Sequence, residues 1–80
     1  MSKEVDFKNR DRFIQLGIAI AALRKMRGMS QEKLAEKIDK TTNFIGAAEA
    51  PNVNRTVSLD TLFDIAKALD VPPYKFFSED

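Results

Sequence analysis

Apolar side chains recur every three or four positions along most of this 80-residue chain, which is the spacing of one face of an α-helix. The first predicted helix runs from Phe13 and ends at Gly28, because glycine readily adopts the left-handed conformation that follows many helices. A second helix begins after Ser30, whose hydroxyl can cap it, and a third runs from Thr42 to about Glu49. The predicted buried faces of these three helices comprise Phe13, Leu16, Ile20 and Leu23, then Leu34, Ala35 and Ile38, then Ile45 and Ala48.

After residue 50, residues that disfavour helices interrupt the apolar pattern, so only short helices can form there. Pro51 and residues 52–56 cannot sustain a helix and predict a loop, after which Ser58 caps a fourth helix. Residues 70–73 end this helix, and residues 74–77 predict one more helical turn. Because strand-like alternation is absent from the sequence, we predict an all-α fold, a compact bundle of five short helices. The apolar face of the fourth helix comprises Leu59, Leu62, Ile65, Ala66 and Leu69.

The length allows one domain, which we place at residues 13–77. Residues 1–12 are polar and charged and are expected to form an N-terminal extension, and residues 78–80 a C-terminal tail. The second and third helices, joined by the turn at residues 39–41, form a helix-turn-helix unit. Such a pair cannot bury its apolar faces alone, so the other helices must complete the core.

On an ordered set of residues the chain resembles the Cro and phage-repressor (XRE) family of helix-turn-helix DNA-binding domains. The resemblance covers about residues 13–77 and implies a lambda-repressor-like fold. The matching residues are Leu16, Gly17, Ile20, Leu23, Arg24, Gly28, Ser30, Gln31, Glu32, Leu34, Ala35, Ile45, Glu49, Leu59, Leu62, Ile65, Ala66, Ala68, Leu69 and Val71.

The resemblance also implies roles for single residues. Gln31 matches a glutamine that contacts a DNA phosphate beside a helix N-terminus, where free N–H groups favour an anion. Arg24 and Glu49 match an internal ion pair, which would remove one positive charge from the surface available to DNA. The third helix matches the recognition helix, whose first residues face base edges in the major groove. The DNA-binding residues expected on this basis are Gln31, Lys40, Thr41, Thr42, Asn43, Phe44, Ala47 and Arg55.

The side chains of the third helix predict modest base reading. Asn43 can bond adenine through two hydrogen bonds, and a threonine methyl group can meet the methyl group of thymine. Phe44 either touches DNA or packs on a neighbouring helix, and both interpretations stay open. The helix lacks arginine, lysine and glutamine, so it cannot supply the commonest guanine contact. We therefore expect recognition to depend on DNA shape and on contacts from the loop that follows.

Some positions depart from the family pattern. Ala48 replaces what is more often a larger apolar residue, which puts the local packing in question. Ala50 and Pro51 stand where a glycine is usual, and the following loop is a few residues longer than is common. One interpretation of these departures is that this chain has lost tight DNA binding.

The net charge of +1 conceals an uneven distribution of charges. Residues 24–40 contain six basic and three acidic side chains, whereas residues 49–80 contain three basic and six acidic ones. This asymmetry suggests a polyanion-binding face, although a solvated surface of mixed charges explains it equally well. Lys33, Lys37, Lys40 and Arg55 are the expected phosphate partners, together with Gln31.

Several classes of function are not expected. The chain has neither histidine nor cysteine, and its carboxylates are scattered, so we expect no enzyme, no metal site and no cofactor. No apolar run approaches the ~20 residues that span a bilayer, and the start has no signal-peptide character, so we expect a cytoplasmic protein without a membrane partner. A small-molecule ligand is not evident either.

The sequence thus predicts a transcriptional regulator that binds double-stranded DNA, with a palindromic operator and a homodimer. The free protein is either already a dimer or a monomer that pairs only on DNA. One recognition helix reads too few base pairs for useful selectivity, whereas two-fold pairing places two helices in successive major grooves. The expected dimer interface contains Tyr74, Phe76 and Phe77. The family resemblance implies that Phe76 or Phe77 also completes the core. The alternative is a protein-interaction module or antitoxin-like partner on the same scaffold, which would use Phe44 or residues 74–77 to bind protein.

Overall fold

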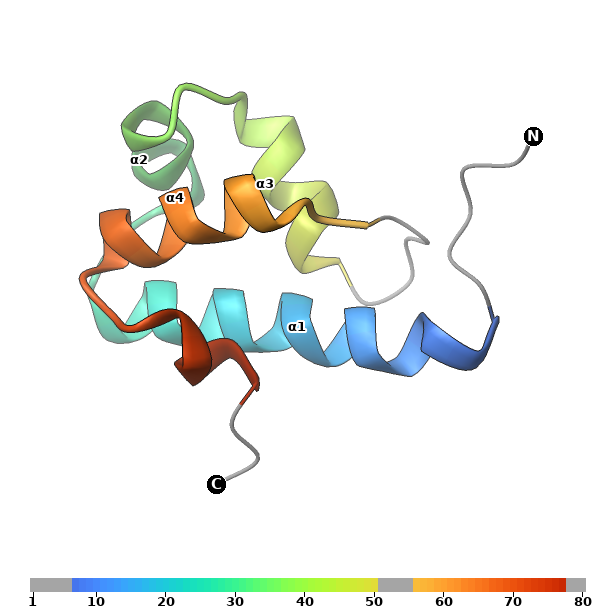
Figure 1. The fold of residues 1–80 in the computed structure, drawn as a ribbon. Helices are drawn as coiled ribbons and strands as arrows, with labels where there is room; N and C mark the ends of the chain where they lie inside the picture. The colour runs from blue at the N-terminus through green and yellow to red at the C-terminus, as the bar shows by residue number, and fades with distance from the viewer. Residues whose placement is uncertain (1–6, 51–55, 78–80) are drawn as a thin grey trace.

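The computed structural model describes residues 7–50 and 56–77, and all regular elements in these two ranges are helical (Figure 1). Four α-helices follow one another along the chain: α1 at Phe7–Met26, α2 at Gln31–Lys37, α3 at Thr42–Glu49 and α4 at Leu59–Leu69. A 3₁₀ helix, η1, spans Pro73–Phe77. The all-α prediction is confirmed, and the bounds predicted for the second, third and fourth helices agree with the structure.

The first helix differs from its predicted bounds. It begins at Phe7, six residues before Phe13, so the second half of the predicted N-terminal extension is helical. Residues 9–12 are exposed to solvent. An exposed helical turn needs no apolar side chain, and the segment contains no proline or glycine that would stop a helix. The apolar periodicity therefore does not predict this part of α1.

The fifth predicted helix is a 3₁₀ helix rather than an α-helix. The segment Pro73–Phe77 is only five residues long, and short pieces of this kind commonly adopt 3₁₀ geometry. The N–H of Lys75 donates to the carbonyl oxygen of Pro72 at 3.0 Å, which is the tighter i to i+3 bond of a 3₁₀ turn. This turn packs against α1 and α4.

The core lies between α1 and α4 and beneath α2 and α3. In Figure 1, α4 is drawn above α1 and runs in nearly the same direction, and η1 is drawn below and in front of α1. Packing is strongest between α2 and α3, and α3 also packs on α1. Such short helices cannot be stable alone, so their stability comes from this shared core. Its buried apolar residues are Leu16, Ile20, Leu34, Ala35, Ile38, Ile45, Leu62, Ile65, Ala66, Leu69 and Phe76.

Side chains and left-handed residues define the helix ends. Ser30, Thr41 and Ser58 each accept a hydrogen bond from the backbone N–H three residues later, which confirms the predicted caps. Gly28 has the predicted left-handed conformation after α1, with φ of 67°. Asp70 has the same conformation after α4, with φ of 57°.

In the described part of the chain, no helix combines the length and the apolar character that crossing a membrane requires.

Candidate nucleic-acid interface

The turn between α2 and α3 sets the angle of the helix-turn-helix unit. The backbone N–H of Lys40 donates to the carbonyl oxygen of Ala35 at 2.9 Å, and Asp39 adopts a left-handed conformation with φ of 60°. The hydroxyl of Thr41 then accepts from the N–H of Phe44 at 3.0 Å, which starts α3. Ala35 is buried, so a larger side chain at this position would have to displace its neighbours.

The first turn of α3 presents the predicted base-reading side chains together. Thr41, Thr42 and Asn43 are all exposed, while Ile45 is fully buried and holds the helix onto the core. Ala47 lies half-buried on the next turn. The exposed face of α3 therefore has polar side chains at its start and only small side chains on the following turn.

Phe44 is half-buried and packs against the core. The ammonium group of Lys40 lies over its ring, 5.4 Å from the centroid, within the range of a cation–π interaction. Phe44 thus packs against the core and also contacts a basic side chain. This contact depends on the geometry of the turn, so the sequence alone does not reveal it.

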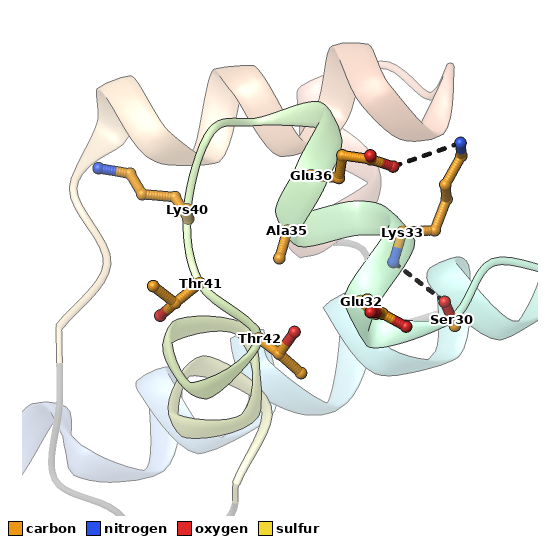
Figure 2. A pocket seen from close by; sticks show the side chains of 8 residues that line it. All are labelled: Ser30, Glu32, Lys33, Ala35, Glu36, Lys40, Thr41 and Thr42. Atoms are coloured by element: carbon orange, nitrogen blue, oxygen red, sulfur yellow. Dashed lines mark hydrogen bonds and ion pairs between the residues drawn. The ribbon is translucent and has the colours of Figure 1, made fainter.

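Next to α3 the surface forms a groove of about 410 Å³ (Figure 2). Its walls come from α2, the turn and the first residue of α3. Glu32 and Glu36 line it with Lys33 and Lys40, and Lys33 forms an exposed ion pair with Glu36 at 3.5 Å (Figure 2). The two acids lie beside lysines that are expected phosphate partners. They lower the local positive potential.

Buried behind the start of α2 is a network centred on Glu49. One carboxylate oxygen of Glu49 accepts from Arg24 Nε at 2.7 Å, and the other accepts from Arg24 Nη2 at 3.0 Å. The ion pair implied by the family resemblance is therefore confirmed. Gln31 Nε2 donates to the same carboxylate at 2.9 Å, a contact that the sequence gave no reason to expect. Arg24 Nη1 donates to the carbonyl oxygen of Met29 at 2.6 Å, which ties the network to the turn before α2.

Two of the six basic side chains at residues 24–40 serve the fold. Arg24 forms the buried ion pair with Glu49. Arg27 Nη2 donates to the carbonyl oxygen of Asp70 at 2.9 Å, which joins the ends of α1 and α4. Lys33, Lys37 and Lys40 remain exposed on the helix-turn-helix unit. Arg55, also predicted to contact DNA, lies outside the described residues.

The predicted dimer residues separate into two groups. Tyr74 and Phe77 are 67% and 62% exposed, whereas Phe76 is only 3% exposed and belongs to the core. The placement of Phe76 at an interface is corrected accordingly: the 3₁₀ turn directs its ring onto α1 and α4, and its neighbours point outward. Other large apolar side chains with substantial exposure include Ile18, Leu59 and Phe63.

The comparison with protein families matches a helix-turn-helix model to residues 20–76, which is most of the chain. The chain belongs to the XRE-type helix-turn-helix family. The resemblance seen in the sequence is thus confirmed. The family is one of DNA-binding transcription regulators. No curated protein matches the sequence significantly.

Solved structures of three regulators resemble this XRE-type chain. The restriction-modification controller protein C.AhdI from Aeromonas hydrophila is 31% identical, with a TM-score of 0.77, and the match covers 84% of this chain and 98% of that one. SinR, a master regulator for biofilm formation solved in complex with DNA, is 27% identical with a TM-score of 0.71, covering 79% and 98%. A point mutant of the controller protein C.Esp1396I is 29% identical with a TM-score of 0.72, covering 81% and 84%.

The family match places α2 and α3, the groove and the Glu49 network within one conserved type of fold, since all lie inside residues 20–76. In an XRE-type domain the arrangement can do two things chemically. Neutral and cationic donors on α2 and the turn can bind phosphate oxygens, and short polar side chains on α3 can bond base edges. Within the described residues, no cluster of three or more acidic side chains could hold a metal ion.

Proposed function

We propose that this protein is a transcriptional regulator that binds double-stranded DNA with α3 in the major groove. The observation that carries the proposal is the first turn of α3, where Thr41, Thr42 and Asn43 are exposed together on a helix fixed to the core by Ile45. The family supports the proposal, as do neighbours that are regulators, one of them solved with DNA.

Two kinds of contact contribute to DNA binding: phosphate contacts orient the protein on the duplex, and base contacts recognise the sequence. Gln31, Lys33, Lys37 and Lys40 contact phosphates, which fix the register of the protein on the duplex without reading sequence. Asn43 bonds an adenine, and the threonines contact methyl groups of thymine. Because α3 offers few long side chains, selectivity depends in part on DNA shape.

The operator is a palindrome bound by a homodimer. Two-fold symmetry places the second α3 roughly 34–36 Å from the first, one helical turn along the DNA. Tyr74 and Phe77 form the contact between subunits, because both rings are largely exposed at the end of the fold. So small an interface forms on DNA more readily than in free solution.

The experiment that tests the function is selection of bound fragments from random double-stranded DNA, followed by titration of the enriched site at low and moderate salt. We expect an inverted repeat with half-sites one helical turn apart and affinity that falls steeply with salt. An unenriched pool together with no binding at low salt would reject the proposal. That outcome would favour the protein-interaction alternative, for which Tyr74 and Phe77 are the exposed candidates.

A further inference from the structure

We propose that Glu49 is a positioning residue for DNA binding: its buried carboxylate holds the Gln31 side chain in the orientation in which the amide donates to a phosphate. This inference rests on the proposed function and assigns to the Arg24–Glu49 pair a task beyond joining α1 to α3.

Arg24 fixes the carboxylate of Glu49 independently of its contact with Gln31. Arg24 and Glu49 are 7% and 8% exposed, and two hydrogen bonds join the guanidinium to both carboxylate oxygens. Arg24 is anchored in turn by its bond to the carbonyl oxygen of Met29. Glu49 therefore presents a rigid acceptor to α2. Its charge is compensated by Arg24, so it does not repel a phosphate bound nearby.

The chemistry of the contact determines which way the amide faces. An ionised carboxylate only accepts hydrogen bonds, so the NH₂ group of Gln31, and not its oxygen, must point at Glu49. Gln31 Oε1 points toward Gly46, where a Cβ would lie 3.9 Å away. One N–H of Nε2 is used by Glu49, and the second is free to donate to a phosphate oxygen.

Fixing the amide in the free protein changes the free energy of binding. A glutamine side chain has several rotatable bonds and loses conformational entropy when it is immobilised. Here folding has already imposed most of that loss, so DNA binding does not have to impose it again. An exposed glutamine such as Gln15 on α1 would have no such advantage.

A double-mutant cycle in DNA affinity tests this coupling. Arg24→Met with Glu49→Met removes the ion pair without leaving a buried unpaired charge, a replacement that proteins often tolerate. Gln31→Ala is then measured in the natural protein and in this double variant, with Gln15→Ala as the matched control. Denaturant unfolding confirms that each protein is folded under the assay conditions.

We expect Gln31→Ala to weaken binding about two- to tenfold in the natural protein, the effect of one hydrogen bond, and hardly at all in the double variant. Because glutamine is neutral, the slope of affinity against salt should stay unchanged. Equal losses in both backgrounds would overturn the positioning role while leaving the proposed function intact. Failure of the natural protein to bind DNA would overturn both.

A second measurement needs no variant and applies even where the double variant does not fold. Side-chain amide relaxation by NMR compares Gln31 with Gln15 in the free natural protein. We expect Gln31 to have an order parameter close to that of rigid backbone, about 0.85, and Gln15 to fall below about 0.6. Equal mobility of the two amides would contradict the proposal.

Discussion

Gly17 in α1 lies so close to α3 that a Cβ atom on it would come within 2.5 Å of the carbonyl oxygen of Ala48. The two helices therefore touch through their backbones at this point. Ala48 is buried beside the contact, and its small side chain is compatible with such a close approach. A larger apolar residue is more usual at position 48. Here α1 and α3 approach closely, so the smaller side chain of Ala48 leaves no gap to be filled.

We predict that Gly17→Ala destabilises the protein. The obstacle is backbone rather than the end of a flexible side chain, so α1 and α3 must separate to admit the methyl group. Overpacking of this kind costs about 1–3 kcal/mol, which outweighs the better helix propensity of alanine. Urea unfolding followed by circular dichroism measures the change. A midpoint equal to or above that of the natural protein would contradict the close approach.

The opposite result is expected at the other helical glycine. A Cβ on Gly46 would meet only Gln31 Oε1, at an ordinary 3.9 Å, so Gly46→Ala introduces no clash. Replacing glycine by alanine inside a helix should then raise the free energy of unfolding by about 0.5–1 kcal/mol. The same urea experiment serves as the measurement. Destabilisation at Gly46 comparable to that at Gly17 would show that the local backbone, not the contact, decides both outcomes.

Local signals explain why so much of the fold was predictable. Ser30, Thr41 and Ser58 start helices through bonds to a backbone N–H three residues later, and Gly28 ends one through its own conformation. Each signal acts within a few residues of the helix end that it sets, and needs no knowledge of the rest of the fold. The apolar periodicity begins only at Phe13, so the predicted start of α1 lies six residues after the observed start at Phe7.

Other features depend on contacts between segments distant in sequence. Phe76 and Phe77 are adjacent and chemically identical, and only the 3₁₀ geometry after Pro73 decides which one is buried. Arg27 was counted with the basic face, but the carbonyl group it binds belongs to Asp70, in a different part of the chain. The Gln31–Glu49 bond likewise joins α2 to the far end of α3. Charge counts and periodicity carry no information on such pairings.

The turn of the helix-turn-helix unit supplies a third prediction. Asp39 has φ of 60°, a conformation that costs an ordinary L-residue roughly 1–2 kcal/mol and costs aspartate less. Asp39→Ala should therefore lower the free energy of unfolding by about 1 kcal/mol, while Asp39→Gly should not lower it. Thermal unfolding of the three proteins side by side provides the test. An alanine variant at least as stable as the glycine variant would refute the argument from backbone strain.

A fourth prediction separates DNA-facing charge from charge elsewhere. Lys40 is held over Phe44 at the start of α3, whereas Lys67 is exposed on α4, outside the helix-turn-helix unit. Lys40→Ala should make the slope of log affinity against log salt less steep by about 0.9 per subunit, since one phosphate contact is lost. Lys67→Ala should leave the slope unchanged. Fluorescence anisotropy at several salt concentrations measures both, and equal slopes for all three proteins would exclude Lys40 from phosphate contact.

The last prediction distinguishes core from interface within η1. Phe76→Ala should cost about 3–5 kcal/mol of folding free energy, because it empties a buried site next to α1 and α4. Tyr74→Ala combined with Phe77→Ser removes two exposed rings, so the fold should keep its stability within about 0.5 kcal/mol. The same double variant should bind a palindromic site mostly as one subunit per DNA at concentrations where the natural protein binds as two. Sedimentation velocity with labelled DNA resolves the two complexes. A two-to-one complex that persists unchanged in the double variant would place the subunit contact elsewhere on the surface, with Ile18, Leu59 and Phe63 as the exposed apolar side chains to examine next.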